Sequence, residues 1–547
     1  MRPSFPYSSR NSGRPPASAS PWPRSLSAVS ILWLAIGALA GETVSVVEAS
    51  KWYDWGFFGA APLTSYESFG AESPLFSLLQ TDERCYDGLI FIEPRGVYVE
   101  TPGPVVTDKD GNLIWMATEW GQAMDLKVQK YKDKDYITFW RGSDSGTFGS
   151  GSYIMLDETY ELFKEIEPVG EGLTGDLHEF RITEEGTALM TIYHRVQVAA
   201  DGEGTDKLWI YDGYFQEVDI ATGELVFEWH ASDHISATNS KQPLDGTGGS
   251  FDNAYDFFHI NSIDKDANGN YLVSSRNVWG VACINGTDGS LLWNLGGQAN
   301  YFEDLSDGAA TDMAWNHHAS WYGNSSLTLF DNAYNGHHWS SDRSRGLIID
   351  LDLENWTAKV RHAYVAPQHS LTPSQGSVQV LPNGNVFVGW GHTPAFTEFT
   401  RDGEVLCDTH FGPIWFANFS WTKTYRSFKF PWVGKPKTVP SVAMRPRQNA
   451  LFASWNGATE VARWVLQSSV DFNSSDIKDH DDVPKVKFET KIQVPDEAEM
   501  YVRVLAMDRN GNVLAHSNPV SRYEKTPPVR RRKVAPCSLE TISSVFP

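Results

Sequence analysis

Histidines stand at the heads of short, mostly apolar runs that predict strands: His178 in LHEFRI, His259 in FHINSI, and His317 and His318 in WNHHASW. A single histidine at a strand head is most often structural. The same residue type at the same step of three successive units indicates a shared site instead. A neutral imidazole is a nucleophile and a proton acceptor near neutral pH. The pattern therefore predicts a histidine site where these strands converge.

An arginine, Arg345, begins the run RGLIIDLD in the same unit as His317. Its planar guanidinium is always charged and suits an oxyanion such as sulfate, phosphate or carboxylate. The formal charge of −23 argues against a nucleic-acid or anionic-membrane partner. An anionic substrate would then need a local cationic pocket, and we predict that His178, His259, His317 and Arg345 supply it.

Acidic residues beside these histidines suggest two further roles. Asp176 in GDLHEF could orient His178, with Glu179 as a weaker candidate. His337 and His338 in NGHHWSSD could instead hold a metal ion, completed by a nearby acidic residue: Asp331 or Asp342. Adjacent histidines point to opposite faces of a strand, which disfavours the metal site. No cofactor or metal is expected.

The elements that must position these residues are short strands. The stretch from Phe257 to Gly297 predicts four antiparallel strands: His259 to Ile263, YLVSSRN, Val278 to Ile284, and SLLWNLGG. Turns rich in Asp, Asn and Gly separate them. Four short strands within about forty residues are typical of one blade of a β-propeller.

The same order of turns and strands recurs along the chain and predicts six blades. They start near these residues: Gly88, Asp125, Leu177, Phe258, His317 and Gln375. After a Pro-rich link the periodicity changes, and alternating strands predict a small β-sandwich of the fibronectin type. The predicted fold is therefore all-β, with a six-bladed β-propeller over 85–430 and a β-sandwich over 431–520. A disordered tail follows at 521–547.

The N-terminal residues 1–41 predict a disordered start and a signal peptide. Residues 26–40, LSAVSILWLAIGALA, are apolar and shorter than the roughly 20 residues that span a bilayer. Secretion is the expectation, and an uncleaved membrane anchor is the alternative. Asn-X-Ser/Thr sequons favour a glycoprotein: Asn285, Asn324, Asn355, Asn418 and Asn473. The four cysteines, widely spaced, exclude a C-x-x-C metal site and permit up to two disulfides of unknown pairing.

At these motifs the chain resembles the arylsulfotransferase family, most of all its fungal secreted branch. FHINSID, WNHHASW followed by SRG, SQGSVQVLPNGNVFVGWG and the Asp-Gly-Trp turns carry the likeness over roughly residues 85–515. The resemblance implies a six-bladed propeller that moves a sulfuryl group from a phenolic sulfate to a phenol without a nucleotide donor. In bacterial members a histidine takes the group covalently. The partners implied are a small phenolic sulfate donor and a phenol acceptor, with the oligomeric state unknown.

The sequence departs from the family where the sixth blade would carry that histidine, because Ser374 to Gly376 contain none. His318 stands where the branch usually has an aspartate. His317, His259 or His392 could be the nucleophile, or the protein could bind an anionic or aromatic ligand without turnover. A third interpretation is a quinone-cofactor propeller dehydrogenase, from turns such as ATGELVFEW, although no calcium site is evident.

Overall fold

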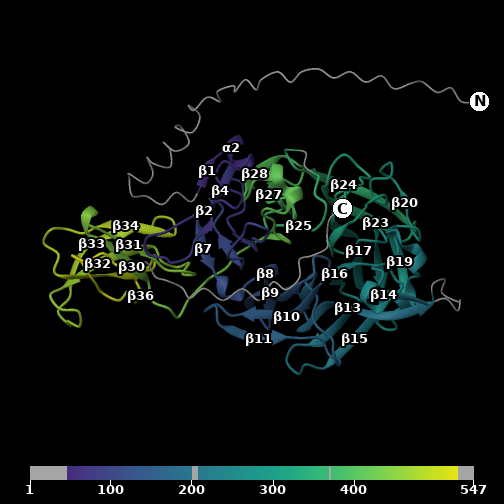
Figure 1. The fold of residues 1–547 in the computed structure, drawn as a ribbon, viewed down its shortest axis with the longest axis horizontal. Coiled ribbons are helices and arrows are strands. Elements are labelled where there is room, and N and C mark those ends of the chain that lie inside the picture. The colour runs from purple at the N-terminus through teal and green to yellow at the C-terminus, as the bar shows by residue number, and fades with distance from the viewer. Residues whose placement is uncertain (1–45, 200–206, 369–370, 528–547) are drawn as a thin grey trace, which may run out of the picture. The chain divides into compact units, whose positions relative to one another are not determined.

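The computed structural model describes residues 46–199, 207–368 and 371–527, and nearly all regular structure among them is β-strand. Figure 1 shows the strands gathered in small sheets along the chain. The predicted signal segment within residues 1–41 lies outside the described residues, as does the part of the tail from 528 to 547. None of the helices described has the length and apolar character that crossing a membrane requires.

Within the described residues, four sheets are each built from four consecutive antiparallel strands. They are β8–β11 (Ala123–Tyr131, Lys134–Asp144, Gly149–Leu156, Leu162–Ile166), β12–β15 (Phe180–Ile182, Thr187–Ala199, Lys207–Asp219, Leu225–His230), β16–β19 (Ile260–Lys265, Tyr271–Ser275, Gly280–Ile284, Leu291–Gly296) and β21–β24 (His317–Trp321, Ser326–Asp331, Arg345–Asp352, Thr357–Val365). The short β20 (Glu303–Asp304) pairs parallel to β24. Apolar residues from successive sheets share core clusters, so each sheet buries its faces against its neighbours.

The strands predicted between Phe257 and Gly297 are confirmed as β16 to β19, with bounds that differ by a few residues. The turn after β16 shows why the sequence folds this way. The Asp266 carboxylate accepts the backbone N–H of Asn270 at 2.8 Å, and Gly269 adopts φ +85°. Only glycine takes that conformation without strain, so the local composition sets the turn.

The sheet that contains residues near Gly88 differs from the sequence prediction. Its order is β29 (Ser427–Phe430), β5 (Leu89–Ile92), β6 (Val105–Thr107) and β7 (Leu113–Met116). Its first strand therefore comes from a segment more than 300 residues further on, and β29 pairs antiparallel with β5. The sequence prediction took Leu89–Ile92 as the first strand of its blade, because the segment is apolar. In the structure it is the second strand, and the first is β29.

The sheet β25–β28 (Ser377–Val380, Val386–Gly389, Ala395–Phe399, Val405–His410) gains two strands from the start of the chain. β4 (Phe76–Gln80) pairs antiparallel with β28, and β1 (Val46–Glu48) pairs parallel with β4. Between them lie α2 (Lys51–Asp54), β2 (Leu63–Thr64) and β3 (Ser73–Pro74). The sequence interpretation assigned no structure to this segment.

One disulfide joins Cys85 to Cys407 among the described residues, which ties the start of the first sheet to β28. Cys283 is a buried free thiol in an apolar cluster with Trp293. Cys537 lies outside the described residues. The disulfide thus covalently closes a loop of 322 residues.

The C-terminal strands form two further sheets with a common apolar core. One contains β30 (Ser441–Arg445), β31 (Ala450–Ser454) and β34 (Glu489–Gln493); the other contains β33 (Lys478–Pro484), β32 (Arg463–Ser469), β35 (Tyr501–Met507) and β36 (Val513–His516), with β37 (Val520–Ser521) on β35. Fully buried Trp464 packs between them. Ser68 donates from its backbone N–H to the Glu489 carboxylate at 2.6 Å, which links the N-terminal segment to these sheets.

Candidate functional site

A cavity of about 820 Å³ opens where the heads of several first strands meet. His178 lies just before β12, His259 just before β16, and His317 begins β21, and all three line this cavity. The ring centroids of His178 and His259 are 5.0 Å apart with nearly perpendicular planes. The structure therefore brings together three of the four residues predicted from sequence.

Two Asp–His pairs face each other among the residues that line this cavity or lie beneath it. The Nδ1 atom of His178 is 2.6 Å from Asp176 Oδ2, as the sequence suggested, and that of His259 is 2.5 Å from Asp256 Oδ2. A carboxylate can only accept, so Nδ1 carries the proton in each neutral ring. Nε2 then keeps its lone pair, and among the described residues it has no hydrogen-bond partner in either histidine.

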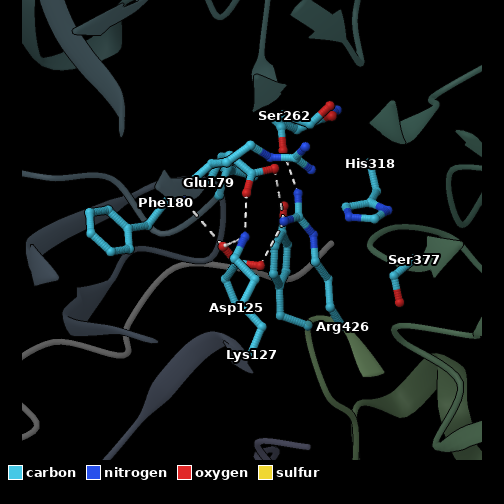
Figure 2. A network of polar contacts seen from close by, with 12 residues as sticks. Asp125, Lys127, Glu179, Phe180, Ser262, His318, Ser377 and Arg426 are labelled. Carbon is cyan, nitrogen blue, oxygen red and sulfur yellow. Dashed lines mark hydrogen bonds and ion pairs between the residues drawn. The ribbon is translucent and has the colours of Figure 1, made fainter. Parts of the chain in front are cut away.

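Asp176 is held in its ionised form. It is fully buried, which alone would raise the pKa of its carboxyl, but His178 and hydrogen bonds from Gly149 and Thr191 outweigh burial and lower this pKa. The carboxylate therefore keeps its proton-accepting role towards His178. Glu179, three residues further on, belongs to a different group of charges and contacts Lys127 and Arg426, as Figure 2 shows.

His317 differs from the other two histidines because both of its ring nitrogens are engaged. Nδ1 lies 2.9 Å from the Trp315 carbonyl oxygen and 2.7 Å from Asn332 Oδ1, two acceptors that require an Nδ1 proton. Nε2 accepts the backbone N–H of Gln375 at 3.2 Å. Burial, followed by the charge of Arg276, holds the pKa of His317 well below its usual value. His317 is thus a neutral side chain whose lone pair is already in use.

His259 is also neutral near pH 7. Burial lowers the pKa of its imidazole, and Asp256 offsets this effect only in part. His392 lines the same cavity from the sheet β25–β28, and burial, then Lys423, lowers its pKa to about 3. Its Nε2 lies 3.0 Å from Ser420 Oγ. Of the three nucleophiles left open by the sequence, only His259 has a free and deprotonated Nε2.

Arg276 is the cation that sequence analysis missed. It lines the cavity, and its guanidinium donates to the Asn277 side-chain oxygen at 3.2 Å and to the Pro373 carbonyl at 3.5 Å. It lies within ion-pair distance of no carboxylate that the structure describes. It follows β17 directly, and its backbone N–H donates to the His259 carbonyl at 3.0 Å. The antiparallel β16–β17 hairpin thus places the end of β17 beside the head of β16. The position of Arg276 and Asn277 directly after the second strand of a predicted hairpin is the sequence signal that could have revealed Arg276.

Arg345, the predicted oxyanion clamp, is not among the residues that line the cavity. Its Nε donates to the buried carboxylate of Asp331 at 2.9 Å across the β22–β23 pair. Asp331 in turn accepts the backbone N–H of Ala314 and Ala333. The ion pair fixes the loops around β22, and the structure does not bring Arg345 together with the three histidines at the cavity.

Further polar atoms at the cavity have no partner within the described part of the chain. They are Tyr425 Oη, Asp256 Oδ1 and Arg95 Nε, all buried. Arg95 also contacts Asp144 through NH1 at 3.4 Å. Buried polar groups are rarely left unpaired, so these three atoms are exceptions among the residues that line the cavity.

A buried network of charged side chains connects residues near the starts of several first strands (Figure 2). Arg426, just before β29, donates to Asp125 at 2.7 Å and to Glu179 at 3.0 Å. Lys127 contacts the same two carboxylates at 2.8 and 2.6 Å. Burial opposes ionisation of Glu179, but Arg426 and Lys127 outweigh it and lower its pKa. Two cations thus balance two carboxylates that come from different sheets.

A second cavity, of about 1340 Å³, lies on the other side of this network. His318 lines this second cavity, whereas its neighbour His317 lines the first. In the same way, Phe428 lines the second cavity and Tyr425 lines the first. The Nδ1 atom of His318 accepts the backbone N–H of Val378 at 3.3 Å. His318 therefore does not join the other histidines.

The suggested metal site does not form. Within residues 46–199, 207–368 and 371–527, no group of three or more His, Cys, Asp or Glu side chains is placed to hold a metal ion. His337 and His338 lie in an exposed turn, where the Asn335 side-chain oxygen accepts both of their backbone N–H groups. The turn geometry accounts for this pair.

The fold and the cavity define an all-β protein with carboxylate-oriented histidines beside an arginine. A protein-family comparison matches residues 127–412, more than half of the chain, to the model described as arylsulfotransferase (ASST). The chain therefore belongs to the arylsulfotransferase family. A search of curated proteins found no match.

Solved structures give more distant matches. A protein of unknown function from Bacteroides caccae is 15% identical, with a TM-score of 0.37, over 63% of this chain and 99% of its own. A putative 6-phosphogluconolactonase from Bacteroides fragilis is 11% identical, with a TM-score of 0.33, over 63% and 99%. The Cps50 (Swd1) β-propeller domain from Myceliophteria thermophila is 11% identical, with a TM-score of 0.31, over 61% and 95%. Similarity this low transfers no property to this chain.

Proposed function

We propose that this protein transfers a sulfuryl group from a phenolic sulfate to a phenol through a covalent histidine intermediate, without a nucleotide donor. The observation that carries the proposal is the pair of facing Asp–His units, each with a free Nε2, beside the unpaired guanidinium of Arg276. Membership of the arylsulfotransferase family supports the reaction class. The fungal secreted branch suggested by the sequence motifs is part of the same proposal.

The proposed architecture is a six-bladed β-propeller followed by a C-terminal β-sandwich. The successive four-stranded sheets support the blades, with β29, β5, β6 and β7 as the blade that joins the two ends of the ring. The two C-terminal sheets with their common core support the sandwich. We place the propeller at 85–430 and the sandwich at 431–520, as the sequence indicated.

In the first step His259 is the nucleophile. Its Nε2 lone pair attacks the sulfur atom, the bond from sulfur to the phenolic oxygen breaks, and the phenolate leaves with the electron pair. The ring then carries the SO₃ group on Nε2 and a proton on Nδ1. The positive charge that develops on the imidazole is stabilised by the Asp256 carboxylate, whose Oδ2 lies 2.5 Å from Nδ1.

In the second step His178 acts as a general base. Its free Nε2 accepts the proton of the acceptor hydroxyl, the acceptor oxygen attacks sulfur, and the N–S bond breaks to restore neutral His259. The Asp176 carboxylate, 2.6 Å from Nδ1, stabilises the imidazolium of His178 until the proton leaves for solvent. The ring separation of 5.0 Å supports the proposal that both histidines act on one sulfuryl group.

Arg276 neutralises the sulfuryl oxygens in both steps. Asp256 is close enough to act on its charge but forms no ion pair with it, so the guanidinium can receive an oxyanion. His317 contributes a rigid neutral wall and Tyr425 a free hydroxyl. The aromatic ring of Tyr425, which lines the cavity close to His178, can pack against a phenolic ring.

The proposal is tested with 4-nitrophenyl sulfate as donor and phenol as acceptor. We expect release of nitrophenol and formation of phenyl sulfate, with loss of both in a His259→Ala variant. His392→Ala is a matched control, because His392 lines the cavity but its Nε2 contacts Ser420. Retention of turnover in His259→Ala would refute the assignment of the nucleophile.

Binding without turnover is the second candidate function. Its supporting observation is the absence of a histidine between Ser374 and Gly376, where bacterial members are expected to carry theirs. In that case the wild-type protein would bind 4-nitrophenyl sulfate and release no nitrophenol with any acceptor. Calorimetric titration of the donor, in parallel with the turnover assay, separates the two functions.

Secretion is proposed together with this activity. The apolar residues 26–40 and the disulfide between Cys85 and Cys407 support an oxidising compartment. Among the sequons, Asn324, Asn355, Asn418 and Asn473 are exposed. Sequencing the N-terminus of the protein recovered from culture medium tests cleavage after the apolar segment; a protein that stays in the membrane fraction would support the anchor instead.

A further inference from the structure

Asn418 is an exposed residue that also lines the histidine cavity, so it stands at the mouth of that cavity. It begins the sequon NFS at 418–420, and of the five sequon asparagines it alone lines the cavity. Its side chain forms no hydrogen bond with any described residue. The amide of Asn355, in another sequon, is already engaged, because its Nδ2 donates to Asp352 at 2.8 Å. The Asn418 amide is therefore open to modification.

The segment that carries Asn418 has a defined local structure. It is the 3-10 helix η4 (Ile414–Phe419), and the turn closes where the Ser420 backbone N–H donates to the Ala417 carbonyl at 2.8 Å. Ser420 takes a left-handed conformation with φ 54°, and its Oγ lies 3.0 Å from Nε2 of His392, another residue that lines the cavity. The last residue of the sequon thus contacts the cavity wall, while the first remains exposed.

An exposed tryptophan stands three residues before Asn418. Trp415 belongs to the same 3-10 helix, and its side chain is 69% exposed. In a 3-10 helix the side chains of residues three apart lie over one another. A group attached to the Asn418 amide therefore starts on the same face of the helix as the indole. The C–H groups of a sugar ring can cover such a flat apolar face and remove it from water.

We propose that Asn418 carries an N-linked glycan whose first sugar packs on Trp415 and whose outer sugars narrow the mouth of the histidine cavity. The proposal rests on the proposed secretion, because sequons are modified in the secretory pathway. The sugar donor is a lipid-linked oligosaccharide pyrophosphate. The bond from Nδ2 to the first sugar carbon forms, the bond from that carbon to the pyrophosphate oxygen breaks, the oxygen keeps the electron pair, and the amide gives up one proton.

The glycan acts on access to the cavity and leaves its chemistry unchanged. His178 and His259 keep their contacts with Asp176 and Asp256, since none of these residues belongs to η4. A bulky substituent on one side of the mouth removes directions of approach, which lowers the rate at which a molecule enters. It also covers an exposed apolar ring that could otherwise associate with other proteins.

The first measurement is the occupancy of Asn418. The full chain is produced in a eukaryotic secretory host, and mass spectrometry identifies the sites at which PNGase F releases a glycan and leaves an aspartate. We expect Asn418 to be occupied, as well as Asn473, which lies in an exposed turn of the C-terminal sheets. A glycan at Asn473 without one at Asn418 would overturn this inference alone. Glycans at neither site would refute the secretion and the inference together.

Hydroxyl-radical footprinting tests the contact with Trp415. Trp339 is the matched control, because it is also 69% exposed and no sequon lies three residues after it. The glycosylated protein should label Trp415 about twofold more slowly than the PNGase F-treated protein, because a sugar on one face of the indole leaves the other face to solvent. Trimming with Endo H, which leaves the first sugar, should preserve this protection. Equal labelling of Trp415 in all three forms would reject the packing.

Access to the cavity is measured by the rate at which diethyl pyrocarbonate modifies His259, a reaction that needs a free ring nitrogen and no catalysis. Removing the glycan should accelerate this reaction about twofold or more. An Asn418→Gln variant from the same host should match the treated protein, whereas Asn473→Gln, which loses a glycan away from the cavity, should match untreated wild type. An unchanged rate after removal would refute the narrowing of the mouth. This outcome is independent of whether the protein transfers a sulfuryl group.

Discussion

Replacing Asp256 by Asn changes the chemistry of His259 while it leaves the shape of the site nearly intact. The carboxylate accepts the Nδ1 proton at 2.5 Å, and its backbone oxygen is separately held by Asn277 Nδ2 at 2.7 Å. An asparagine can turn its amide nitrogen towards Nδ1, which moves the imidazole proton to Nε2 and removes the attacking lone pair. It can also turn its oxygen there, which keeps the tautomer but loses the negative charge.

The magnitude follows from that charge. A carboxylate about 4 Å from the positive charge that develops on the imidazole stabilises it by roughly 4 kcal/mol at an effective dielectric constant of about 20. Losing it should slow sulfuryl transfer about 1000-fold, at about 1.4 kcal/mol for each factor of ten. The wrong tautomer would give a loss of up to about 10⁴-fold, as for the corresponding change in serine proteases.

The assay is a rapid-mixing experiment without acceptor. Wild type should release one equivalent of nitrophenol in a burst, and mass spectrometry should find one added SO₃ group on the peptide with His259. Asp256→Asn should lose the burst. The matched Asp176→Asn variant should keep the burst and lose transfer to the acceptor, because Asp176 supports His178. A burst of wild-type rate in Asp256→Asn, or an adduct on His178, would refute the division of roles.

Three further outcomes are expected. Arg276→Lys should lower kcat/KM for the donor about 10²-fold because the fork of donors is lost, whereas Arg345→Lys should stay near wild type because its partner Asp331 lies outside the cavity; steady-state kinetics of both variants decide this. Burial, then Arg95, lowers the pKa of Lys423 to about 7, so its charge is lost as pH rises through that value. KM for the anionic donor should therefore increase between about pH 6 and about pH 8, and a Lys423→Met variant that keeps the increase would contradict this origin. Replacing Cys85 and Cys407 by Ser should lower the free energy of unfolding by about 2–4 kcal/mol with little effect on kcat, as measured by denaturant unfolding; unchanged stability would show that the disulfide is dispensable.

Local signals in the sequence were sufficient for the strands of the unit between Phe257 and Gly297. The Asp-Gly and Asn-Gly turns and the alternation around Phe257 to Gly297 are short-range features, and β16 to β19 follow them closely. The pairing of β29 with β5 joins segments more than 300 residues apart, and no local pattern encodes it. The same limit applies to β4, which extends the β25–β28 sheet beyond β28.

The candidate site was predicted in part for a similar reason. His178, His259 and His317 share one step of the repeat, so a pattern could find them. Arg276 stands at the end of a second strand, and only the hairpin register places it beside His259. Arg345 has the right chemistry and the right unit, but its cross-strand neighbour is the buried Asp331. Residue type alone could not distinguish an arginine in an ion pair, such as Arg345, from one without an ion pair among the described residues, such as Arg276.

Charge balance explains how a protein with a formal charge of −23 can attract an anion to this cavity. Beneath the histidines, Arg426 and Lys127 compensate Asp125 and Glu179 within the buried network, so that layer adds little net field. Burial keeps the histidines His259 and His317 uncharged. The guanidinium of Arg276 is then a local positive charge at the cavity that has no carboxylate within ion-pair distance in the described residues, in a site where burial reduces the screening by water. Neutralising it in an Arg276→Met variant should abolish saturable donor binding, while the Asp256→Asn variant should still bind the donor.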